Sequence, residues 1–152
     1  MGMEAPPFAR VPSPFRGHRR RGILLAVIPP VTVLIVDDQA PFRDVARLVV
    51  DMTDGFEVVG EATDGISGVT AAAELAPALV LMDLNMPDID GFEATRRIRA
   101  TLPLTRVLML STHDPADYRA QALAAGAFDF MTKSSFDPLV LEGAWADEEA
   151  GT

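Results

Sequence analysis

The chain has 152 residues, of which 49% are hydrophobic and 23% charged, the size and composition of one globular domain with its own core. It contains no cysteine, so disulfide bonds and thiolate metal sites are excluded. The formal net charge is −9, and the acidic residues lie almost entirely after residue 30. The folded part should therefore repel nucleic acid and attract cations or basic partners.

Residues 1–30 form a separate basic segment that is interrupted by six prolines. No regular apolar spacing survives there, so we expect a disordered tail. An apolar run follows Arg19–Arg21, but it is too short to span a membrane and has no small-residue cleavage site, which disfavours a secretory signal. A start codon placed too early, with the domain beginning at Val31, and a basic phosphate-binding tail are the alternatives.

Strand-like and helix-like segments alternate through the rest of the chain. Apolar and β-branched runs predict five strands, and helical spacing of apolar residues predicts a helix after each. The last helix should be short, because Gly143 weakens it, and residues 146–152 should fray. This alternation predicts a parallel sheet with helices on both faces and right-handed crossovers. The expected strands are 31–36, 56–60, 78–83, 106–110 and 127–131, and the expected helices are 42–52, 64–75, 92–101, 115–125 and 138–145.

The third strand ends in a carboxylate. The apolar run of residues 78–82 leads directly into Asp83, and turn residues that include Pro87 follow it. Such an unbroken run is typical of a strand buried on both faces, so Asp83 should stand where ligands bind in open α/β sheets. A carboxylate in that place requires a cation or hydrogen-bond donor nearby.

Polar residues end three other predicted strands at the same edge. Asp37 and Asp38 follow the first strand, Ser111 follows the fourth, and Lys133 follows the fifth. Three carboxylates in one pocket need a cation, and ligands that are all oxygen suit Mg²⁺. The serine hydroxyl and the lysine, the only one in the chain, would have a role if a phosphoryl group shared the pocket.

These residues, in this order, resemble a bacterial response regulator receiver domain over about residues 31–142. The matching elements are Val36-Asp37-Asp38, Met82-Asp83, Met86-Pro87, Asp90-Gly91, Ser111 and Lys133. Residues 108–114 and 124–127 are most similar to receivers that are fused to a helix-turn-helix output domain. The resemblance implies a flavodoxin-like α/β fold of five parallel strands in the order 2-1-3-4-5. It places the domain at residues 31–145, between the basic tail and a short acidic end at 146–152.

The resemblance also implies a metal site and a phosphoacceptor. Asp83 would accept the phosphoryl group as a nucleophile. Asp38, Asp83 and the backbone carbonyl of Asn85 would ligate Mg²⁺, and Asp37 would help directly or through water. The donor would be a histidine kinase or a phosphotransfer protein, in the cytoplasm. The domain would catalyse only its own phosphorylation and dephosphorylation.

The remaining roles concern the response to phosphorylation. Lys133 would pair with one phosphoryl oxygen, and Ser111 would donate its hydroxyl to another. Phe130, three residues before Lys133, would turn inward as Ser111 moves and would alter the face formed by the fourth helix, fifth strand and fifth helix. That face would bind a protein partner or support a weak homodimer, without direct contact to nucleic acid or membrane. Asn85 and His113 occupy positions where the family tunes dephosphorylation.

Other interpretations remain for these residues. Phe130 taken alone is more plausible as an ordinary core residue, and Ser111 could be a strand-end hydroxyl. The chain could also be a remnant or excerpt of a transcription regulator whose DNA-binding output domain is missing. A phosphatase of the haloacid dehalogenase type would need a second aspartate two positions after the first, whereas Asp37-Asp38-Gln39 follows the first strand here. Ser134 stands where many receivers have proline.

Overall fold

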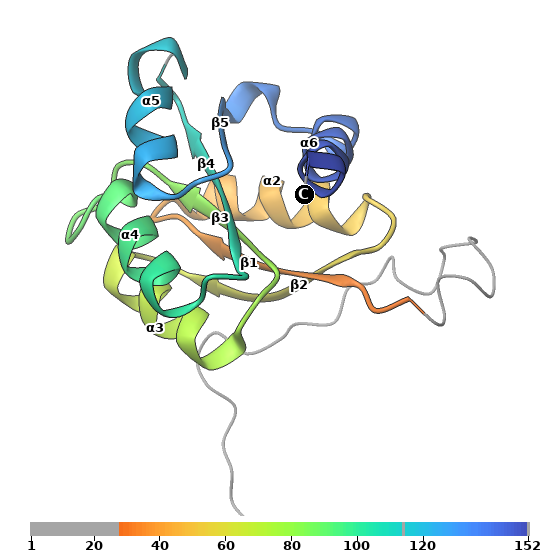
Figure 1. The fold of residues 1–152 in the computed structure, drawn as a ribbon, viewed down its shortest axis with the longest axis horizontal. Helices are drawn as coiled ribbons and strands as arrows, with labels where there is room; N and C mark the ends of the chain where they lie inside the picture. Colours follow the sequence, from red (N-terminus) through yellow and green to blue (C-terminus); the bar gives the residue numbers. More distant parts are fainter. Residues whose placement is uncertain (1–27, 114, 152) are drawn as a thin grey trace, which may run out of the picture.

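The computed structural model describes residues 28–113 and 115–151, so the expectations for residues 1–27 lie outside the described part. Five parallel strands form one sheet in the order β2-β1-β3-β4-β5, which confirms the predicted topology (Figure 1). The strands are β1 (Val31–Val36), β2 (Phe56–Ala62), β3 (Leu79–Asp83), β4 (Arg106–Ser111) and β5 (Asp129–Thr132).

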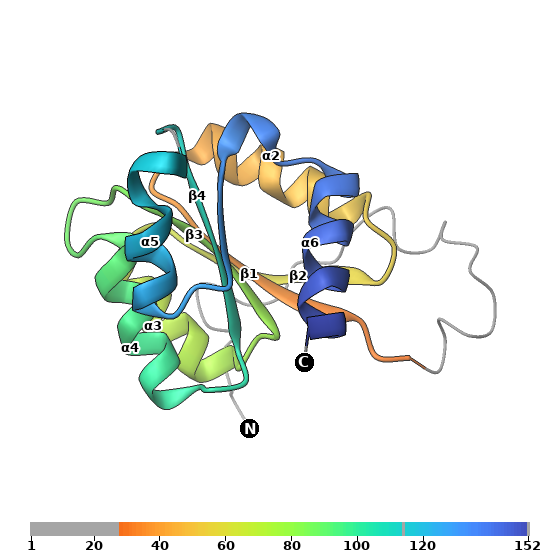
Figure 2. The same ribbon diagram turned by 45° about the horizontal axis from the view of Figure 1, so that its top comes forward.

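Helices cover both faces of this sheet. In Figures 1 and 2, α3, α4 and α5 lie together on one side, and α2 and α6 lie on the other. The helices are α2 (Ala40–Asp51), α3 (Gly65–Leu75), α4 (Gly91–Thr101), α5 (Pro115–Ala125) and α6 (Pro138–Gly151), with a 3₁₀ turn, η2 (Lys133–Ser135), after β5. Of these helices, none is long and apolar enough to cross a membrane.

Each face of the sheet has its own hydrophobic core. Successive strand residues point to opposite faces, so Leu34 and Val36 face α3 to α5, whereas Val33 and Ile35 face α2 and α6. Because both faces are covered, β3 is buried along its entire length. The unbroken apolar run before Asp83 is thus explained by its place at the centre of the sheet.

The last helix is longer than predicted. We expected it to end near Trp145 because of Gly143, with the remaining residues frayed. Instead α6 continues to Gly151. A side chain at Gly143 would meet nothing within 4 Å in the described structure, so this glycine lies on an open face and weakens the helix only through its backbone entropy.

Tertiary contacts explain why α6 persists beyond the glycine. The ring of Trp145 packs edge-on against Phe56 and Phe128, with centroids 6.0 and 6.5 Å apart. The guanidinium of Arg106 lies 4.5 Å from the Trp145 ring centroid and also pairs with Glu149 at 3.2 Å. These contacts attach the second half of α6 to the sheet, and such packing outweighs local helix propensity.

Candidate functional site

The carboxyl ends of the strands bring the predicted site residues to one edge of the sheet. Asp83 is the last residue of β3, and Asp37 directly follows β1, where Val36 lies beside Met82. Ser111 ends β4, in register with Thr132, and Lys133 is the next residue after β5. The parallel register therefore gathers side chains that are far apart in the sequence, as the alternating pattern predicted.

Three carboxylates lie together at this edge. Asp37, Asp38 and Asp83 each offer one oxygen, and these atoms lie within 4.8 Å of one another. Asp37 and Asp83 are buried, with relative exposures of 1% and 6%, whereas Asp38 is exposed. A cluster of carboxylate oxygens that is open to solvent on one side fits Mg²⁺, which keeps several of its waters. Asn85, whose backbone carbonyl was the other expected ligand, is exposed and lies two positions after Asp83.

Lys133 contacts two of the three carboxylates. Its Nζ lies 2.7 Å from Asp37 Oδ2 and 3.1 Å from Asp83 Oδ1. Burial tends to lower the pKa of Lys133, but its hydrogen bond to Asp37 and the charges of Asp83 and Asp37 outweigh this and raise that pKa above its ordinary value. The side chain is therefore a cation held inside the pocket, as the sequence interpretation required.

At Lys133 the neighbouring groups favour the charged form, whereas at Asp83 the surroundings disfavour it. Its pKa is raised from 3.8 to about 6, first because the carboxyl is buried and second because Asp37 repels its charge. Lys133 lowers this pKa but does not cancel the two effects, and Asp38 raises it slightly further. A carboxylate that is short of positive charge is a suitable place for an additional cation.

Phe42 completes the surroundings of Lys133. The lysine Nζ lies 4.6 Å from the Phe42 ring centroid, and the Phe42 ring in turn packs 6.4 Å from that of Phe136. From the sequence, Phe42 was expected only as the first residue of a helix over residues 42–52. Its position in the first turn of α2, four residues after Asp38, was the available signal that it would lie near the pocket.

Ser111 and Phe130 adopt a defined arrangement beside the pocket. The Ser111 hydroxyl accepts a hydrogen bond from the His113 backbone N–H at 3.0 Å and lies 3.2 Å from His113 Nδ1. Phe130 is 1% exposed, and its ring faces inward against Tyr118, with centroids 6.3 Å apart. Tyr118 also packs edge-on against His113 at 5.6 Å, so an unbroken row of contacts joins Ser111 to Phe130.

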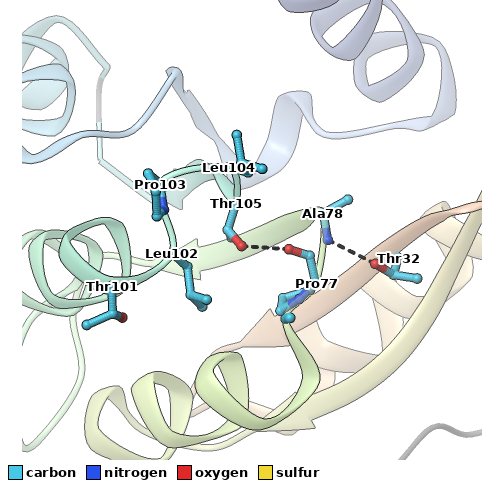
Figure 3. Close-up of a pocket in the computed structure, with 9 residues that line it drawn as sticks. Thr32, Pro77, Ala78, Thr101, Leu102, Pro103, Leu104 and Thr105 are labelled. Carbon is cyan, nitrogen blue, oxygen red and sulfur yellow. Dashed lines mark hydrogen bonds between the residues drawn. The ribbon is translucent and has the colours of Figure 1, made fainter.

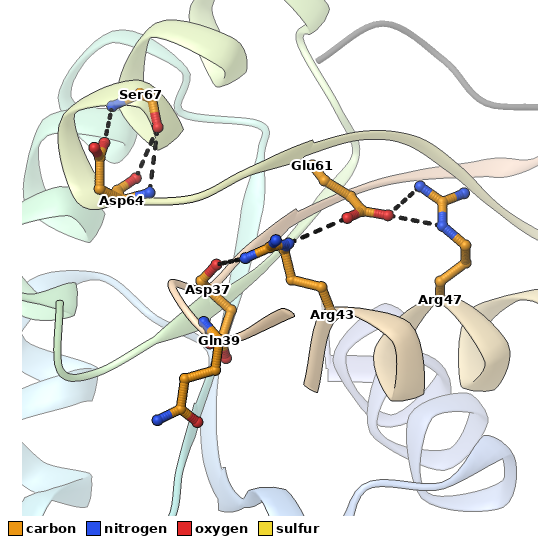
Figure 4. A network of polar contacts seen from close by, with 7 residues as sticks. All are labelled: Asp37, Gln39, Arg43, Arg47, Glu61, Asp64 and Ser67. Carbon is orange, nitrogen blue, oxygen red and sulfur yellow. Dashed lines mark hydrogen bonds and ion pairs between the residues drawn. The ribbon is translucent and has the colours of Figure 1, made fainter. Parts of the chain in front are cut away.

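A polar network fixes the end of β1 relative to α2 and β2 (Figure 4). Arg43 Nη1 donates to the carbonyl oxygen of Asp37 at 2.8 Å, and its Nε lies 3.3 Å from Glu61 Oε1. Glu61 also pairs with Arg47, one helical turn further along α2. The Gln39 backbone N–H donates to Asp37 Oδ1 at 2.8 Å, which orients that carboxylate. These contacts were not predictable from the sequence, since no local spacing relates Glu61 to α2.

The loop after β3 is fixed at both ends. The carboxylate of Asp88 accepts hydrogen bonds from the Gly65 and Ile66 backbone N–H groups at 2.9 and 2.7 Å, at the start of α3. Gly91 donates to the Leu84 carbonyl at 2.7 Å, and a Cβ at Gly91 would collide with the Asp83 carbonyl oxygen. The helix expected over residues 92–101 is confirmed as α4, which begins at Gly91 with Asp90 as its N-cap. The required absence of a side chain at Gly91 became evident only from the structure.

A separate apolar pocket lies at the opposite, amino-terminal edge of the sheet (Figure 3). It has a volume of about 470 Å³, and its lining includes Leu102 and Leu104. Its polar groups already have partners, because Thr105 Oγ donates to the Pro77 carbonyl at 2.8 Å and Ala78 N donates to the Thr32 hydroxyl at 2.9 Å. Its lining residues carry no charge, unlike the edge of the sheet that holds the three carboxylates and Lys133.

Comparison with known proteins agrees with this fold. A family model described as the response regulator receiver domain matches residues 33–142. A LuxR-family two-component response regulator from Aurantimonas sp. SI85-9A1 has a similar structure, with a TM-score of 0.72 and 34% identity over 80% of this chain and 86% of that chain. The response regulator domain of Thermotoga maritima CheB gives a TM-score of 0.69 and 34% identity over 77% of this chain and 95% of that chain.

Curated relatives are longer than this chain. It is 41% identical over 118 residues to a protein-glutamate methylesterase/protein-glutamine glutaminase of Geobacter metallireducens, which covers 76% of this chain and 33% of the relative. It is 32% identical over 121 residues to the transcriptional regulatory protein DegU of Brevibacillus brevis, covering 80% of this chain and 51% of the relative. The chain thus corresponds to about a third to a half of each of these proteins.

Proposed function

Because the chain belongs to the family of response regulator receiver domains, we propose that it accepts a phosphoryl group on Asp83 in two-component signalling. The single observation that best supports this proposal is the position of Asp83 in the pocket. Its carboxylate ends the central strand, contacts Lys133 at 3.1 Å, and lies with Asp37 and Asp38 in a cluster that could hold a cation. These are the groups that a phosphoryl transfer to a carboxylate requires.

The transfer itself would be a displacement at phosphorus. An oxygen of Asp83 would form a new bond to phosphorus while the bond from phosphorus to an imidazole nitrogen of the donor breaks, and the imidazole would leave with the electron pair. Lys133 would shift its ammonium from the Asp83 carboxylate toward a phosphoryl oxygen. Mg²⁺, held by Asp38, Asp83 and the Asn85 carbonyl with help from Asp37, would supply the positive charge that offsets the incoming negative charge.

The proposed output follows from the row of contacts between Ser111 and Phe130. Ser111 would have to exchange its His113 contacts for a phosphoryl oxygen, and His113 packs on Tyr118, which packs on Phe130. A change at Ser111 would therefore reach the face made by α5 and β5. We place the phosphorylation-dependent protein partner on the surface formed by α5, β5 and α6, either a different protein or a second copy.

We also propose a phosphodonor and a cellular location for this protein. A histidine kinase or a phosphotransfer protein would be the donor, and the protein would work in the cytoplasm without an enzymatic substrate of its own. A second candidate is that the chain represents the receiver part of a longer regulator. The observation that favours this candidate is that the relatives named above extend well beyond the matched region.

Intact mass spectrometry tests the proposal directly. The protein is incubated with Mg²⁺ and acetyl phosphate, alongside Asp83→Asn and the exposed control Asp44→Asn. We expect one added phosphoryl group in the wild type and in Asp44→Asn, none in Asp83→Asn, and none after chelation of Mg²⁺. If no adduct forms, binding of beryllofluoride, an analogue of the phosphoryl group, distinguishes rapid hydrolysis from loss of function. A wild type that neither forms an adduct nor binds beryllofluoride would refute the proposed function.

A further inference from the structure

The ammonium of Lys133 is enclosed on three sides, and one side is an aromatic face. Two sides are the carboxylates of Asp37 and Asp83, at 2.7 and 3.1 Å. The third is the ring of Phe42, with 4.6 Å between Nζ and the ring centroid. This distance is within the range of a cation–π interaction, and the lysine side chain is only 10% exposed.

We propose that Phe42 is a positioning residue that holds the Lys133 ammonium over the carboxylate pocket, in the place where it can meet a phosphoryl oxygen. This inference rests on the proposed function, because it concerns how Lys133 is presented for that transfer. Nothing in the strand-end arrangement requires an aromatic residue at this position in α2, and the contact therefore calls for a separate explanation.

A lysine side chain is flexible. Its ammonium is carried on a stem of four carbons and has three equivalent donors, so the charge alone does not define a direction. When a phosphoryl group is attached to Asp83, the ammonium has to move from the Asp83 carboxylate to a phosphoryl oxygen. An aromatic face attracts the cation but offers no oxygen that would compete with the phosphoryl group. The ring therefore restricts the positions that the ammonium can occupy but leaves its N–H donors free to bind a phosphoryl oxygen.

The surroundings of Phe42 make the ring a fixed wall. Phe42 lies in the first turn of α2, directly after Pro41. The Phe42 backbone N–H donates to the Gln39 carbonyl at 3.1 Å. Its ring is supported from behind by Phe136, at 6.4 Å and a tilt of 47°. Phe136 lies in the short connection between η2 and α6, but its side chain is buried in the core beneath α2 and α6, so the Phe42 ring rests against that core.

A rival interpretation is that Phe42 only contributes apolar packing with Phe136. The two interpretations differ in what the ring does to Lys133, and Lys133 is the only lysine in the chain. Isotope-labelled lysine therefore gives NMR signals from this single side chain. If the ring face covers the ammonium, its ring current should move the Lys133 Cε proton signals upfield in the metal-free protein.

The test compares Phe42→Leu, Phe42→Tyr and Phe136→Leu with the wild type. Phe42→Leu keeps an apolar side chain but removes the aromatic face, so the upfield shift should disappear and phosphorylation by acetyl phosphate should slow by roughly three- to thirtyfold. Phe42→Tyr should restore the shift and bring the rate back to within about threefold of the wild type. Phe136→Leu is the packing control: leucine keeps apolar support behind the Phe42 ring, so most of the shift should remain and the rate should fall by less than about threefold.

Two results would overturn this inference while leaving the proposed function intact. The first is a phosphorylated wild type whose Lys133 signals show no upfield shift. The second is a rate for Phe42→Leu that falls no further than that of Phe136→Leu. Phe42→Met is measured in parallel for the case in which Phe42→Leu does not fold, and the same outcomes apply to it. A wild type that shows the shift but neither forms an adduct nor binds beryllofluoride would instead refute the proposed function.

Discussion

Lys133 Nζ lies 3.1 Å from Asp83 Oδ1, so the only lysine of the chain contacts the carboxylate at the end of the central strand. This contact lowers the pKa of Asp83 but does not bring it back to its ordinary value. Burial and the repulsion from Asp37 still raise the pKa of Asp83 to about 6. The folded protein therefore favours the protonated form of Asp83 more than the unfolded chain does, and at neutral pH the charged carboxylate opposes folding.

The first prediction concerns the pH dependence of stability. A carboxyl with a higher pKa in the folded state binds more protons there, so its stabilising contribution is complete below pH 3.8 and is lost as the pH rises through about 6. Asp83→Asn should therefore raise the free energy of unfolding of the metal-free protein by roughly 1 to 3 kcal/mol at about pH 7. Urea unfolding of both proteins in a chelator, at several pH values, measures this difference.

The pH profile identifies the cause of the difference. The advantage of Asp83→Asn over the wild type should shrink as the pH falls from about 6 toward 3.8. Asp44→Asn, on the exposed side of α2, should differ from the wild type by less than about 0.5 kcal/mol throughout. A difference between Asp83→Asn and the wild type that is constant over this pH range would show that titration of Asp83 is not responsible.

The second prediction concerns Mg²⁺. The oxygens of Asp37, Asp38 and Asp83 lie within 4.8 Å of one another, and Lys133 offsets only part of their charge. Mg²⁺ should therefore stabilise the wild type, by about 2.7 kcal/mol at a hundredfold excess over its dissociation constant. Asp83→Asn and Asp38→Asn should gain less, since each removes one charged ligand. Thermal unfolding with and without Mg²⁺, against NaCl at the same ionic strength, gives the measurement. Equal gains in the wild type and both variants would contradict a metal site at this cluster.

Much of the fold could be predicted because the local patterns and the global arrangement agree. Each apolar run ended in turn residues, and the runs were too uniform for strands with one solvent-exposed face, so a sheet covered on both faces was the consistent solution. The end of α6 was not predictable in this way. Gly143 is unfavourable by local propensity, and the packing of Trp145 against Phe56 and Phe128 depends on residues far away in the sequence.

The site was predictable to the extent that strand topology determines it. Asp83 and Lys133 were expected at one edge because parallel strands share a direction, and their side chains do lie in contact there. The contact of Lys133 with Phe42 depends on how α2 packs over that edge, which no spacing along the chain reveals. The same holds for Asp88, which lies in the loop after β3 but caps a different helix.

The third prediction concerns this cap. Burial tends to raise the pKa of Asp88, but its hydrogen bonds from backbone N–H groups, first those of Ile66 and Gly65 at the start of α3, together outweigh this and lower that pKa below 3.8. Asp88→Ala should therefore lower the free energy of unfolding by about 0.5 to 2 kcal/mol at neutral pH. Asp88→Asn should lose less, because the amide oxygen can still accept. Urea unfolding of the two variants and the wild type measures both losses.

The pH dependence of this cap has the opposite sign to that of Asp83. A carboxyl with a lowered pKa stabilises the fold above its ordinary value of 3.8 and loses this effect as the pH falls through the folded value. The difference between the wild type and Asp88→Ala should therefore narrow in strong acid. Hydrogen exchange at Gly65 and Ile66 should be faster in Asp88→Ala. Unchanged exchange at these two amides would argue against a capping role.

The fourth prediction compares two glycines that the structure places in opposite surroundings. A Cβ at Gly91 would collide with the backbone of Asp83 and Leu84, whereas one at Gly143 would meet nothing within 4 Å in the described structure. Gly143→Ala should stabilise the protein by about 0.5 to 1 kcal/mol, because alanine restricts the unfolded chain and favours the helix. Gly91→Ala should destabilise it by about 1 to 3 kcal/mol, because backbone rather than a flexible side chain must move.

The consequence for function separates the two variants further. The backbone that must move in Gly91→Ala carries the Asp83 carboxylate, so phosphorylation by acetyl phosphate should slow in this variant even where the protein remains folded. Gly143 lies in α6, whose described contacts are with the sheet and α2 and do not include the backbone of Asp83. Gly143→Ala should therefore be phosphorylated at the wild-type rate. Urea unfolding and the rate of mass increase, measured on the same samples, check both statements. A folded Gly91→Ala protein with wild-type kinetics would show that α4 can shift away from β3 without disturbing the carboxylate.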